Sequence, residues 1–390
     1  MAIILLVTNI PFLTTKFVQE LTDQLKANAM RLGFALCGVT VAAQPTRYSK
    51  LINWLDAGYA GQMRYLDERR EAYRHPSSVL DGCRTLLMLG FPYRTHEPPQ
   101  NNSGLGRVAR YAWNDRDYHD LIHDRLRQLK AWLVEKVPTA RIRGIVDTAP
   151  LLEREFAEAA GIGWVGKNTL LLDRRFGSYF FLAALLTDLE LVHDAPQEKG
   201  YCGTCRACLD ACPTQAFPRP FVLDATRCIS YLTIETKGEI PAEIAWEVGE
   251  WLFGCDICQE VCPWNRKAEQ ASQSQLNPLD SFKQIDLIEL LRMDDATFRQ
   301  SFRGTPFTRP KRAGMLRNAA VVLGNQQCED AVPALIQLLS ESEPMLRATA
   351  AEALVKIAAP AGVLAVQNAA QLEPNDQLRA RLARLLKLVP

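Results

Sequence analysis

The sequence predicts three consecutive parts: an α/β domain, a module of bacterial-ferredoxin type for two iron-sulfur clusters, and an α-helical tail with HEAT-like repeats. Helical and strand patterns alternate to about residue 195, cysteine runs fill residues 202–263, and no strand pattern follows residue 285. The 390 residues are 48% hydrophobic, enough to bury several cores. We place an N-terminal extension at 1–16, the α/β domain at 17–198, the cluster module at 199–266 and the helical tail at 267–390.

The first part alternates between segments with the hydrophobic period of a helix and segments with the pattern of a buried strand. Residues 17–34 form an amphipathic pattern that ends at Gly33, a residue type that favours a helix C-terminus. Residues 34–40 and 84–91 predict buried strands, and residues 117–137 predict a long amphipathic helix. A short strand at 143–147 leads into a helix at 149–163, and two strands follow at 169–173 and 178–188. This alternation predicts the α/β domain.

Two matched cysteine runs define the second part. CGTCRACLDACP spans residues 202–213, and its second half returns as CDICQEVCP at 255–263. In C-x2-C-x2-C-x3-C-P, three thiolates hold one 4Fe-4S cluster and the fourth ligates the other. Cys228 can supply the thiolate that the second run lacks, which brings the total to eight. The predicted ligand sets are Cys202, Cys205, Cys208 and Cys262 for one cluster, and Cys212, Cys228, Cys255 and Cys258 for the other.

Zinc is the main alternative for these cysteines. C-x2-C pairs also make tetrahedral zinc sites, but zinc does not require a third cysteine at the same short interval. Disulfides are rarer in such a context. The spacing therefore favours iron-sulfur clusters. Outside the two sets, Cys37, Cys83 and Cys328 are expected to be small buried hydrophobes.

The net charge and the N-terminal residues bear on whether the protein binds polyanions or membranes. The formal charge of +1 means that a polyanion must be bound by a local basic patch. Residues 3–7 are apolar, but the run is too short to span a membrane, no basic residue precedes it, and no cleavage site follows. We expect a cytoplasmic protein without a membrane contact.

The helical tail carries a repeat and a basic run. MLRNAA at residues 315–320 recurs as MLRATA at 345–350, which indicates stacked helix pairs of HEAT-like type. Residues 299–317 contain no acidic residue, and such a run fits either phosphate contacts or a plain surface. Its basic members are Arg299, Arg303, Arg309, Lys311, Arg312 and Arg317.

Two further features have competing interpretations. GIGWVGKN, residues 161–168, fits the G-x-G-x-x-G pattern, but a helix precedes it and a strand follows, so we reject nucleotide binding and predict a turn with a close backbone approach. Asp147 ends a predicted strand before Thr148 and Pro150. From the residues alone, we favour an N-cap over a catalytic acid, although ligands often meet a sheet at such strand ends.

The order of the motifs resembles the epoxyqueuosine reductase family. VDTAPLLEREFAEAAGIGWVGKN is followed by FGSYFFLA, the first cysteine run, RCISYLTIETKG and FGCDICQEVCPWN, and then by HEAT-like helices. The resemblance covers nearly the whole chain from about residue 17. It implies cobalamin beside two 4Fe-4S clusters, and reduction of epoxyqueuosine to queuosine at the wobble position of tRNA with a GUN anticodon. It also implies an unidentified reductant protein, and we expect a monomer.

The resemblance also assigns roles to individual residues. It makes Asp147 the proton donor, in place of the N-cap, and we expect burial beside the corrinoid to raise the pKa of Asp147. Asp117 and His119 begin a D-x-H-x-x-G pattern, but Ile122 replaces its glycine, so we expect no histidine on cobalt. Ala109 stands where some members have a cysteine near cobalt. Implied cobalamin contacts are Arg74, Asp147, Lys167, Asn168, Leu171, Leu182, Ile229, Ser230, Asp256 and Ile257. Predicted tRNA contacts are Lys237, Arg309, Lys311, Arg312 and Arg317.

Two other functions remain open at this point. A reductive dehalogenase for small organohalides would use the same cofactors, but the basic helical tail argues against it. A non-catalytic iron-sulfur carrier would need the cluster module alone and would leave the α/β domain unexplained. For epoxyqueuosine reduction, opening the epoxide to an alkene requires two electrons, which side chains cannot provide, so a redox cofactor is expected.

Overall fold

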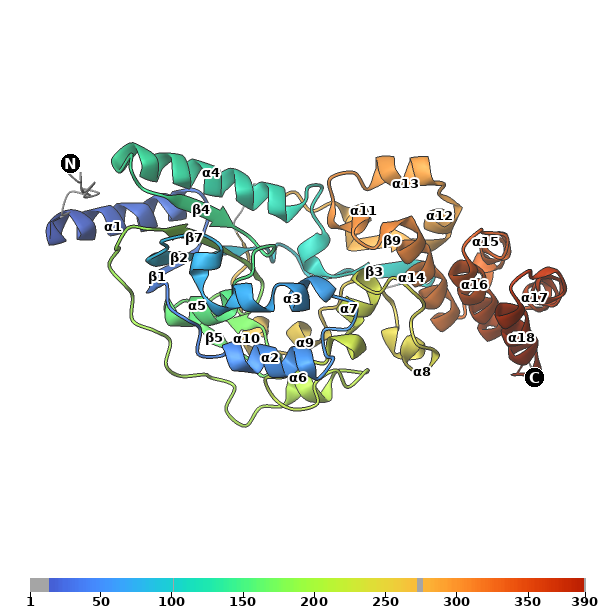
Figure 1. The fold of residues 1–390 in the computed structure, drawn as a ribbon. Helices are drawn as coiled ribbons and strands as arrows, with labels where there is room; N and C mark the ends of the chain where they lie inside the picture. Colours follow the sequence, from blue (N-terminus) through green and yellow to red (C-terminus); the bar gives the residue numbers. More distant parts are fainter. Residues whose placement is uncertain (1–13, 101, 272–275, 389–390) are drawn as a thin grey trace, which may run out of the picture.

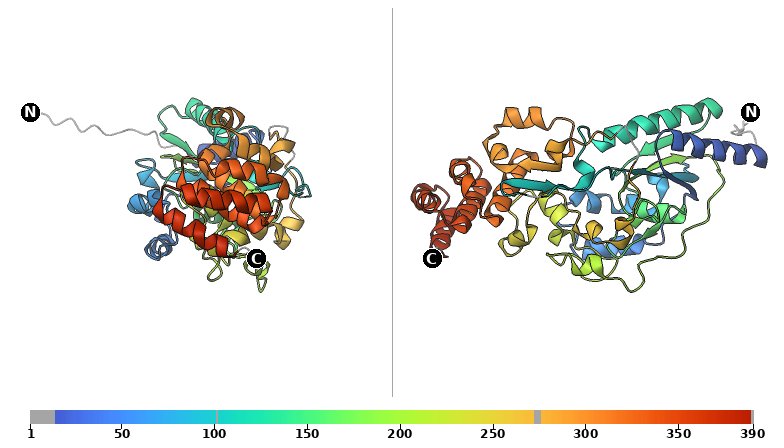
Figure 2. Two further views of the ribbon diagram at one scale, coloured as in Figure 1. Left: turned by 90° about the vertical axis from the view of Figure 1, so that its right-hand side faces the viewer. Right: turned by 180° about the vertical axis from the view of Figure 1, so that it is seen from behind.

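The structure, a computed structural model, describes residues 14–100, 102–271 and 276–388. The described chain is elongated: helices α1 (Thr15–Arg31) and α4 (Tyr118–Lys136) lie toward one end, and α17 (Pro360–Leu372) and α18 (Asp376–Leu385) lie at the other (Figure 1, Figure 2). Helix α1 begins two residues before the predicted domain boundary, and the apolar run at 3–7 lies outside the described residues. None of the helices in the described part is both long enough and apolar enough to cross a membrane.

A four-stranded sheet forms the centre of the first domain. Its order is β1 (Leu36–Val41), β2 (Thr85–Pro92), β7 (Phe180–Thr187) and β4 (Ile142–Ile145), and every neighbouring pair is antiparallel. Strands β2 and β7 pair along their full length, with Met88 opposite Ala184. All eight residues of β2 are buried, as expected for a central strand covered on both faces.

Side chains of the sheet alternate between two cores. Leu87 and Leu89 point into a core with α1 and α4, whereas Leu86 and Met88 point into a core with α5 (Glu153–Ala159). This period of two places helices on both faces and gives three layers. The predicted helices and buried strands of this domain are thus confirmed. Helices α2 (Tyr48–Asp56) and α3 (Arg64–Glu68) fall between β1 and β2 in the chain.

The two strands predicted after α5 belong to different sheets, and the N-cap expected at Asp147 is wrong. Residues 169–173 and 178–188 do not pair with each other: β6 (Leu171–Leu172) pairs with β5 (Trp164–Val165), and β7 enters the central sheet. The predicted glycine turn before β6 is confirmed, because a Cβ on Gly163 would lie 2.1 Å from the Leu172 carbonyl oxygen. Asp147 is not an N-cap, since α5 begins at Glu153 and is preceded by Leu152.

The cysteine module consists of short helices. They are α6 (Ala207–Asp210), α7 (Ile229–Ile234), α8 (Ala242–Ala245), α9 (Ile257–Glu260) and α10 (Pro263–Arg266). A second sheet joins the module to its neighbours, in the order β8 (Trp251–Phe253), β3 (Leu105–Val108) and β9 (Gln284–Asp286). Each strand comes from a different predicted domain, a connection that the sequence patterns did not indicate.

The tail is helical after β9, as predicted. The two copies of the repeat lie on α14 (Lys311–Asn325) and α16 (Pro344–Ile357), where Leu316 and Leu346 are buried in one core. This core continues through β3 and β8 to Val108 and Phe253. The remaining helices are α11 (Asp280–Lys283), α12 (Leu287–Arg292), α13 (Asp295–Ser301) and α15 (Val332–Leu338).

Candidate functional site

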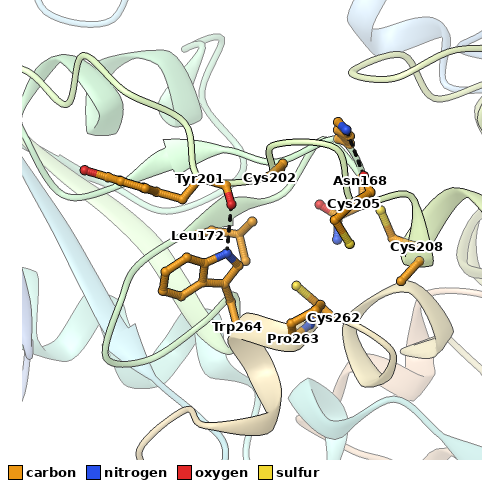
Figure 3. A pocket seen from close by; sticks show the side chains of 11 residues that line it. Asn168, Leu172, Tyr201, Cys202, Cys205, Cys208, Cys262, Pro263 and Trp264 are labelled. Atoms are coloured by element: carbon orange, nitrogen blue, oxygen red, sulfur yellow. Dashed lines mark hydrogen bonds between the residues drawn. The ribbon is translucent and has the colours of Figure 1, made fainter.

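The first predicted cysteine set surrounds a cavity. Cys202, Cys205, Cys208 and Cys262 line a space of about 260 Å³ together with Trp264, and Figure 3 shows their side chains around it. Burial, followed by the charges of the other three thiols, raises the pKa of Cys208 to about 11. Four thiolates this close repel one another, so the arrangement suits a cationic inorganic cluster.

The second set gathers beside the first. Burial raises the pKa of Cys255, Cys258 and Cys228, and the charges of their neighbours in the set raise it further. Cys258 interacts with Cys212 of its own set and with Cys208 of the other, which places the two sets next to each other. All eleven cysteines are free thiols, so no disulfide competes for these ligands. The arrangement fits two clusters, and the ligand sets stay a prediction.

Lys167 and Asn168 also line the first cavity. The Lys167 ammonium donates to the carbonyl oxygens of Gly203 (2.6 Å) and Cys205 (2.8 Å), so this side chain holds the ligand loop. The Asn168 side chain is buried, and its Nδ2 has no acceptor among the described residues. This orphaned donor suits an acceptor on a bound cofactor.

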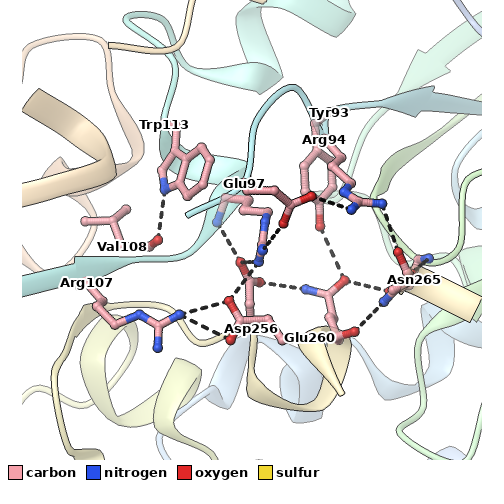
Figure 4. A network of polar contacts seen from close by, with 12 residues as sticks. Tyr93, Arg94, Glu97, Arg107, Val108, Trp113, Asp256, Glu260 and Asn265 are labelled. Carbon is pink, nitrogen blue, oxygen red and sulfur yellow. Dashed lines mark hydrogen bonds and ion pairs between the residues drawn. The ribbon is translucent and has the colours of Figure 1, made fainter. Parts of the chain in front are cut away.

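A buried polar network connects the cluster module with the first domain (Figure 4). The Asp256 carboxylate accepts from the Arg110 backbone N–H at 2.8 Å and lies 3.4 Å from the Arg110 guanidinium. Both side chains are at most 5% exposed. Arg110 also contacts Glu260 at 2.9 Å. Burial raises the pKa of Asp256, and the nearby arginine opposes this shift. The network fixes the segment that carries Cys255 and Cys258.

Asp147 lies at the end of β4 in a left-handed backbone conformation, with φ = 57°. Its N–H donates to Glu153 Oε1 at 3.1 Å, which supports this unusual conformation. Its Oδ2 accepts from the Tyr118 hydroxyl at 3.1 Å and lies 3.4 Å from His119 Nε2. The hydrogen bond from His119 lowers the pKa of Asp147. In the protein alone the pKa of Asp147 is thus lowered, and the rise expected from burial beside cobalamin stays a prediction.

The other implied cobalamin residues lie on several elements. Arg74 ends a short helical turn, Arg70–Arg74, and lies 3.6 Å from Glu71. Leu171 and Leu182 belong to β6 and β7. Ile229, Ser230 and Ile257 lie at the starts of α7 and α9, each next to a cysteine of the second set. Their contact with cobalamin stays a prediction.

The predicted tRNA contacts fall into two groups. Arg309 is 56% exposed, pairs with Glu235 at 3.1 Å, and is close enough to Asp147 to help lower its pKa. Lys311 begins α14, and Lys237 follows α7 in the chain. Arg312 is more enclosed, because it donates to Met293 O at 2.7 Å and to Glu341 at 2.5 Å.

Arg317 contradicts its predicted role. It is fully buried, and its guanidinium donates to the backbone carbonyl oxygens of Thr236, Gly238 and Leu232 at 2.6–2.8 Å. Such a side chain has no surface for RNA, so the contact with tRNA is wrong in this structure. A basic run does not reveal which members point inward, and this explains the error.

Sequence reasoning missed the residues around Asp147. Tyr118, His119 and Glu153 all contact it, yet Asp117 and His119 were considered only as an incomplete cobalt-binding pattern. The available signal was the position of Asp117 before an amphipathic helix, which is typical of an N-cap. Asp117 is indeed the N-cap of α4 and accepts from the His119 N–H at 2.9 Å.

Comparisons with known proteins agree with these features. Residues 74–148 match the family model "Epoxyqueuosine reductase QueG, DUF1730", residues 201–265 match a 4Fe-4S double cluster binding domain, and residues 313–387 match HEAT repeats. Epoxyqueuosine reductase of Escherichia coli K12 is 34% identical over 374 residues, covering 95% of this chain and 97% of the relative. The enzyme of Pseudomonas aeruginosa is 41% identical over 310 residues, covering 78% and 86%.

Solved structures show the same relationship. A crystal structure of epoxyqueuosine reductase with an epoxyqueuosine-modified tRNA-Tyr stem loop superimposes with a TM-score of 0.89 at 30% identity, covering 95% of this chain and 99% of that one. A structure of the Bacillus subtilis enzyme also gives 0.89 at 30% identity, covering 96% and 100%. The chain belongs to the epoxyqueuosine reductase family.

Proposed function

We propose that this protein reduces epoxyqueuosine to queuosine at the wobble position of tRNA. The observation that carries the proposal is the combination of family membership over 95% of the chain with the two adjacent cysteine sets and the Asp147 site. A relative of the same fold was crystallised with an epoxyqueuosine-modified stem loop, which is the substrate class proposed here. Removal of the epoxide oxygen requires two electrons, two protons and a way to hold the RNA.

The eight cysteines would hold two 4Fe-4S clusters, and cobalamin would bind beside them. When bound, these groups supply the electrons that side chains cannot provide. The implied cobalamin residues next to Cys228 and Cys255 lie on the segments that carry the second cysteine set, which supports a route from cluster to corrinoid. The buried network around Asp256 and Arg110 holds one of these segments in place.

Asp147 is the proposed proton donor to the departing oxygen. Its side chain is 64% exposed, so a substrate can reach it, and its backbone position is fixed by Glu153. Because its pKa is lowered here, the carboxyl group is ionised at neutral pH in this structure. The proton must therefore come to Asp147 from a neighbouring group during turnover.

The RNA would be held by exposed basic residues near Asp147. Arg309 borders both Asp147 and Tyr65, and it is 56% exposed although it forms two hydrogen bonds with Glu235. Lys311 and Lys237 lie on the adjoining segments, and phosphate contacts from such residues make binding salt-dependent. An anticodon loop with a GUN sequence presents an unstacked base at little cost. We expect a monomer that acts in the cytoplasm with a separate reductant protein.

The test is turnover of modified tRNA by anaerobically reconstituted protein. The wild-type protein should convert epoxyqueuosine to queuosine when a low-potential reductant is present. Asp147→Asn should retain iron, sulfide and cobalamin but lose at least about 100-fold in rate, the scale of general acid catalysis. Conversion by Asp147→Asn at the wild-type rate would contradict the assignment of the acid, and absence of conversion by the wild-type protein would contradict the function.

A further inference from the structure

We propose that His119 is a catalytic proton carrier that recharges Asp147 within each turnover, with Asp117 as its positioning residue. The three side chains form a continuous chain. Asp117 Oδ1 lies 2.7 Å from His119 Nδ1, and His119 Nε2 lies 3.4 Å from Asp147 Oδ2. The inference rests on the proposed epoxyqueuosine reduction and names the group that supplies its protons through Asp147.

The proton balance of the reaction calls for such a group. An epoxide becomes an alkene when both C–O bonds break, and the oxygen leaves as water after accepting two electrons and two protons. The electrons come from the reductant by way of the bound cofactors. One carboxyl group can deliver one proton, and it is then a carboxylate. Because Asp147 is already a carboxylate at rest, it must accept a proton from a neighbour for each proton that it delivers.

His119 is the neighbour with the right geometry. Its Nε2–H can pass a proton to Asp147 Oδ2, after which the neutral ring takes up another from solvent, since the side chain is 29% exposed. The 3.4 Å separation is long for a hydrogen bond, as is common at catalytic sites before the substrate binds. Tyr118 also touches Asp147 Oδ2 at 3.1 Å, but an ordinary phenol holds its proton too firmly to act as the carrier near neutral pH.

Packing fixes the orientation of the imidazole. The Tyr118 ring stacks on His119 at 4.0 Å and on Phe181 of β7 at 4.2 Å, so the central sheet supports the stack. Asp117 accepts from both the His119 N–H and Nδ1, which leaves Nε2 directed at Asp147. Capping of α4 explains the contact between Asp117 and the His119 N–H. It does not explain the contact between Nε2 and Asp147.

Local charge keeps the proton on His119 at rest. Burial acts to lower the pKa of His119, but the hydrogen bonds and charges of Asp117 and Asp147 outweigh it and raise the pKa to about 9. The same contact lowers the pKa of Asp147. At neutral pH the pair is therefore an imidazolium beside a carboxylate, which is the loaded state of a proton carrier.

Other charged groups surround this pair. From α4, His123 interacts unfavourably with a protonated His119. From the β4–α5 segment, burial and then the Asp147 charge raise the pKa of Glu153 to about 8, while Arg154 lies close to both carboxylates. From the tail, Arg309 favours ionised Asp147. Besides Tyr118, the tyrosines that interact with Asp147 are Tyr65, Tyr73 and Tyr111.

The experiment compares His119→Gln and Asp117→Asn with the wild-type protein, with His193→Gln on an exposed segment as the control. Glutamine retains hydrogen-bonding groups but cannot carry a proton at neutral pH. Asparagine retains the N-cap of α4 but removes the charge that faces Nδ1. Single-turnover rates on modified stem loops from pH 6 to 10 are measured together with stem-loop affinity. NMR titration of labelled histidine gives the ionisation of His119 independently of turnover.

We expect His119→Gln to lower the rate about 100-fold with affinity unchanged within about twofold. The wild-type rate should fall as pH rises through the ionisation of His119, because the carrier is then empty. Asp117→Asn should shift two quantities to lower pH by about one unit or more: the pH at which the rate falls, and the midpoint of the His119 NMR titration. A rate for His119→Gln within twofold of wild type, or a His119 midpoint at or below about 6.5, overturns the proposal. If the wild-type protein does not turn over, the proposed function fails, and the NMR midpoint still decides whether His119 holds the proton.

Discussion

Arg317→Met is expected to loosen the attachment of the helical tail to the cluster module. Arg317 lies on α14, and its guanidinium donates to three backbone carbonyl oxygens, one within α7 and two just after it. Burial lowers the pKa of Arg317 to about 10, with no carboxylate to offset it. Methionine fills similar volume but leaves the three backbone carbonyl groups and the Asn318 Oδ1 atom without the Arg317 donor, at about 1 kcal/mol each at the low end. Removal of a buried charge recovers part of this loss, so we expect a net destabilisation of about 2–3 kcal/mol.

Thermal unfolding followed by circular dichroism measures this effect. A loss of this size should lower the Tm by about 4–12 °C, using the range for domains of 150–250 residues. Arg303→Met is the matched control, because Arg303 belongs to the same basic run but is exposed, and its substitution should change the Tm by less than about 2 °C. If Arg317→Met unfolds within 1 °C of the wild-type protein, the carbonyl contacts do not hold the tail as described. Limited proteolysis should also cut Arg317→Met faster near residues 232–238.

Two further predictions concern the clusters and the RNA surface. Cys262→Ser removes a predicted ligand and should reduce iron and acid-labile sulfide to about half after anaerobic reconstitution. The control is Cys83→Ser, which changes a buried thiol outside both sets and should leave both contents unchanged. Equal iron in the two variants would contradict the ligand sets. Arg309→Ala should weaken stem-loop binding and reduce the slope of log K against log salt by about one unit. An unchanged slope would place the phosphate contact elsewhere.

Local patterns predicted much of the fold, because hydrophobic periodicity reports directly on which faces are buried. Residues 117–137 illustrate this: their 3.6-residue period matches helix α4 within one residue at each end. The pairing of β7 with both β2 and β4 was not predictable, since the partner of a buried strand depends on contacts distant in sequence. Strand β3 has four residues and too few side chains to produce a recognisable alternation.

The candidate site was predictable where chemistry imposes spacing. Cysteine intervals reveal cluster ligands because the ligand geometry restricts them, and the predicted sets do lie together in space. Asp147 was first interpreted as a helix cap, because a carboxylate between a strand and a helix looks the same in both roles. Its contact with His119 joins residues 28 positions apart, and no local pattern records such a contact. Arg317 shows the converse, since its charge suggested RNA while its environment is fully buried.

The β8–β3–β9 sheet has a consequence for how the enzyme can be divided. Its middle strand comes from the first domain, and its two edges come from the cluster module and from the start of the tail. A cluster module excised at residues 199 and 266 would keep β8 but lose the strand beside it, and would expose an apolar edge. Transplanting this module into another host, or expressing it alone as an electron carrier, therefore requires residues 105–108 to travel with it.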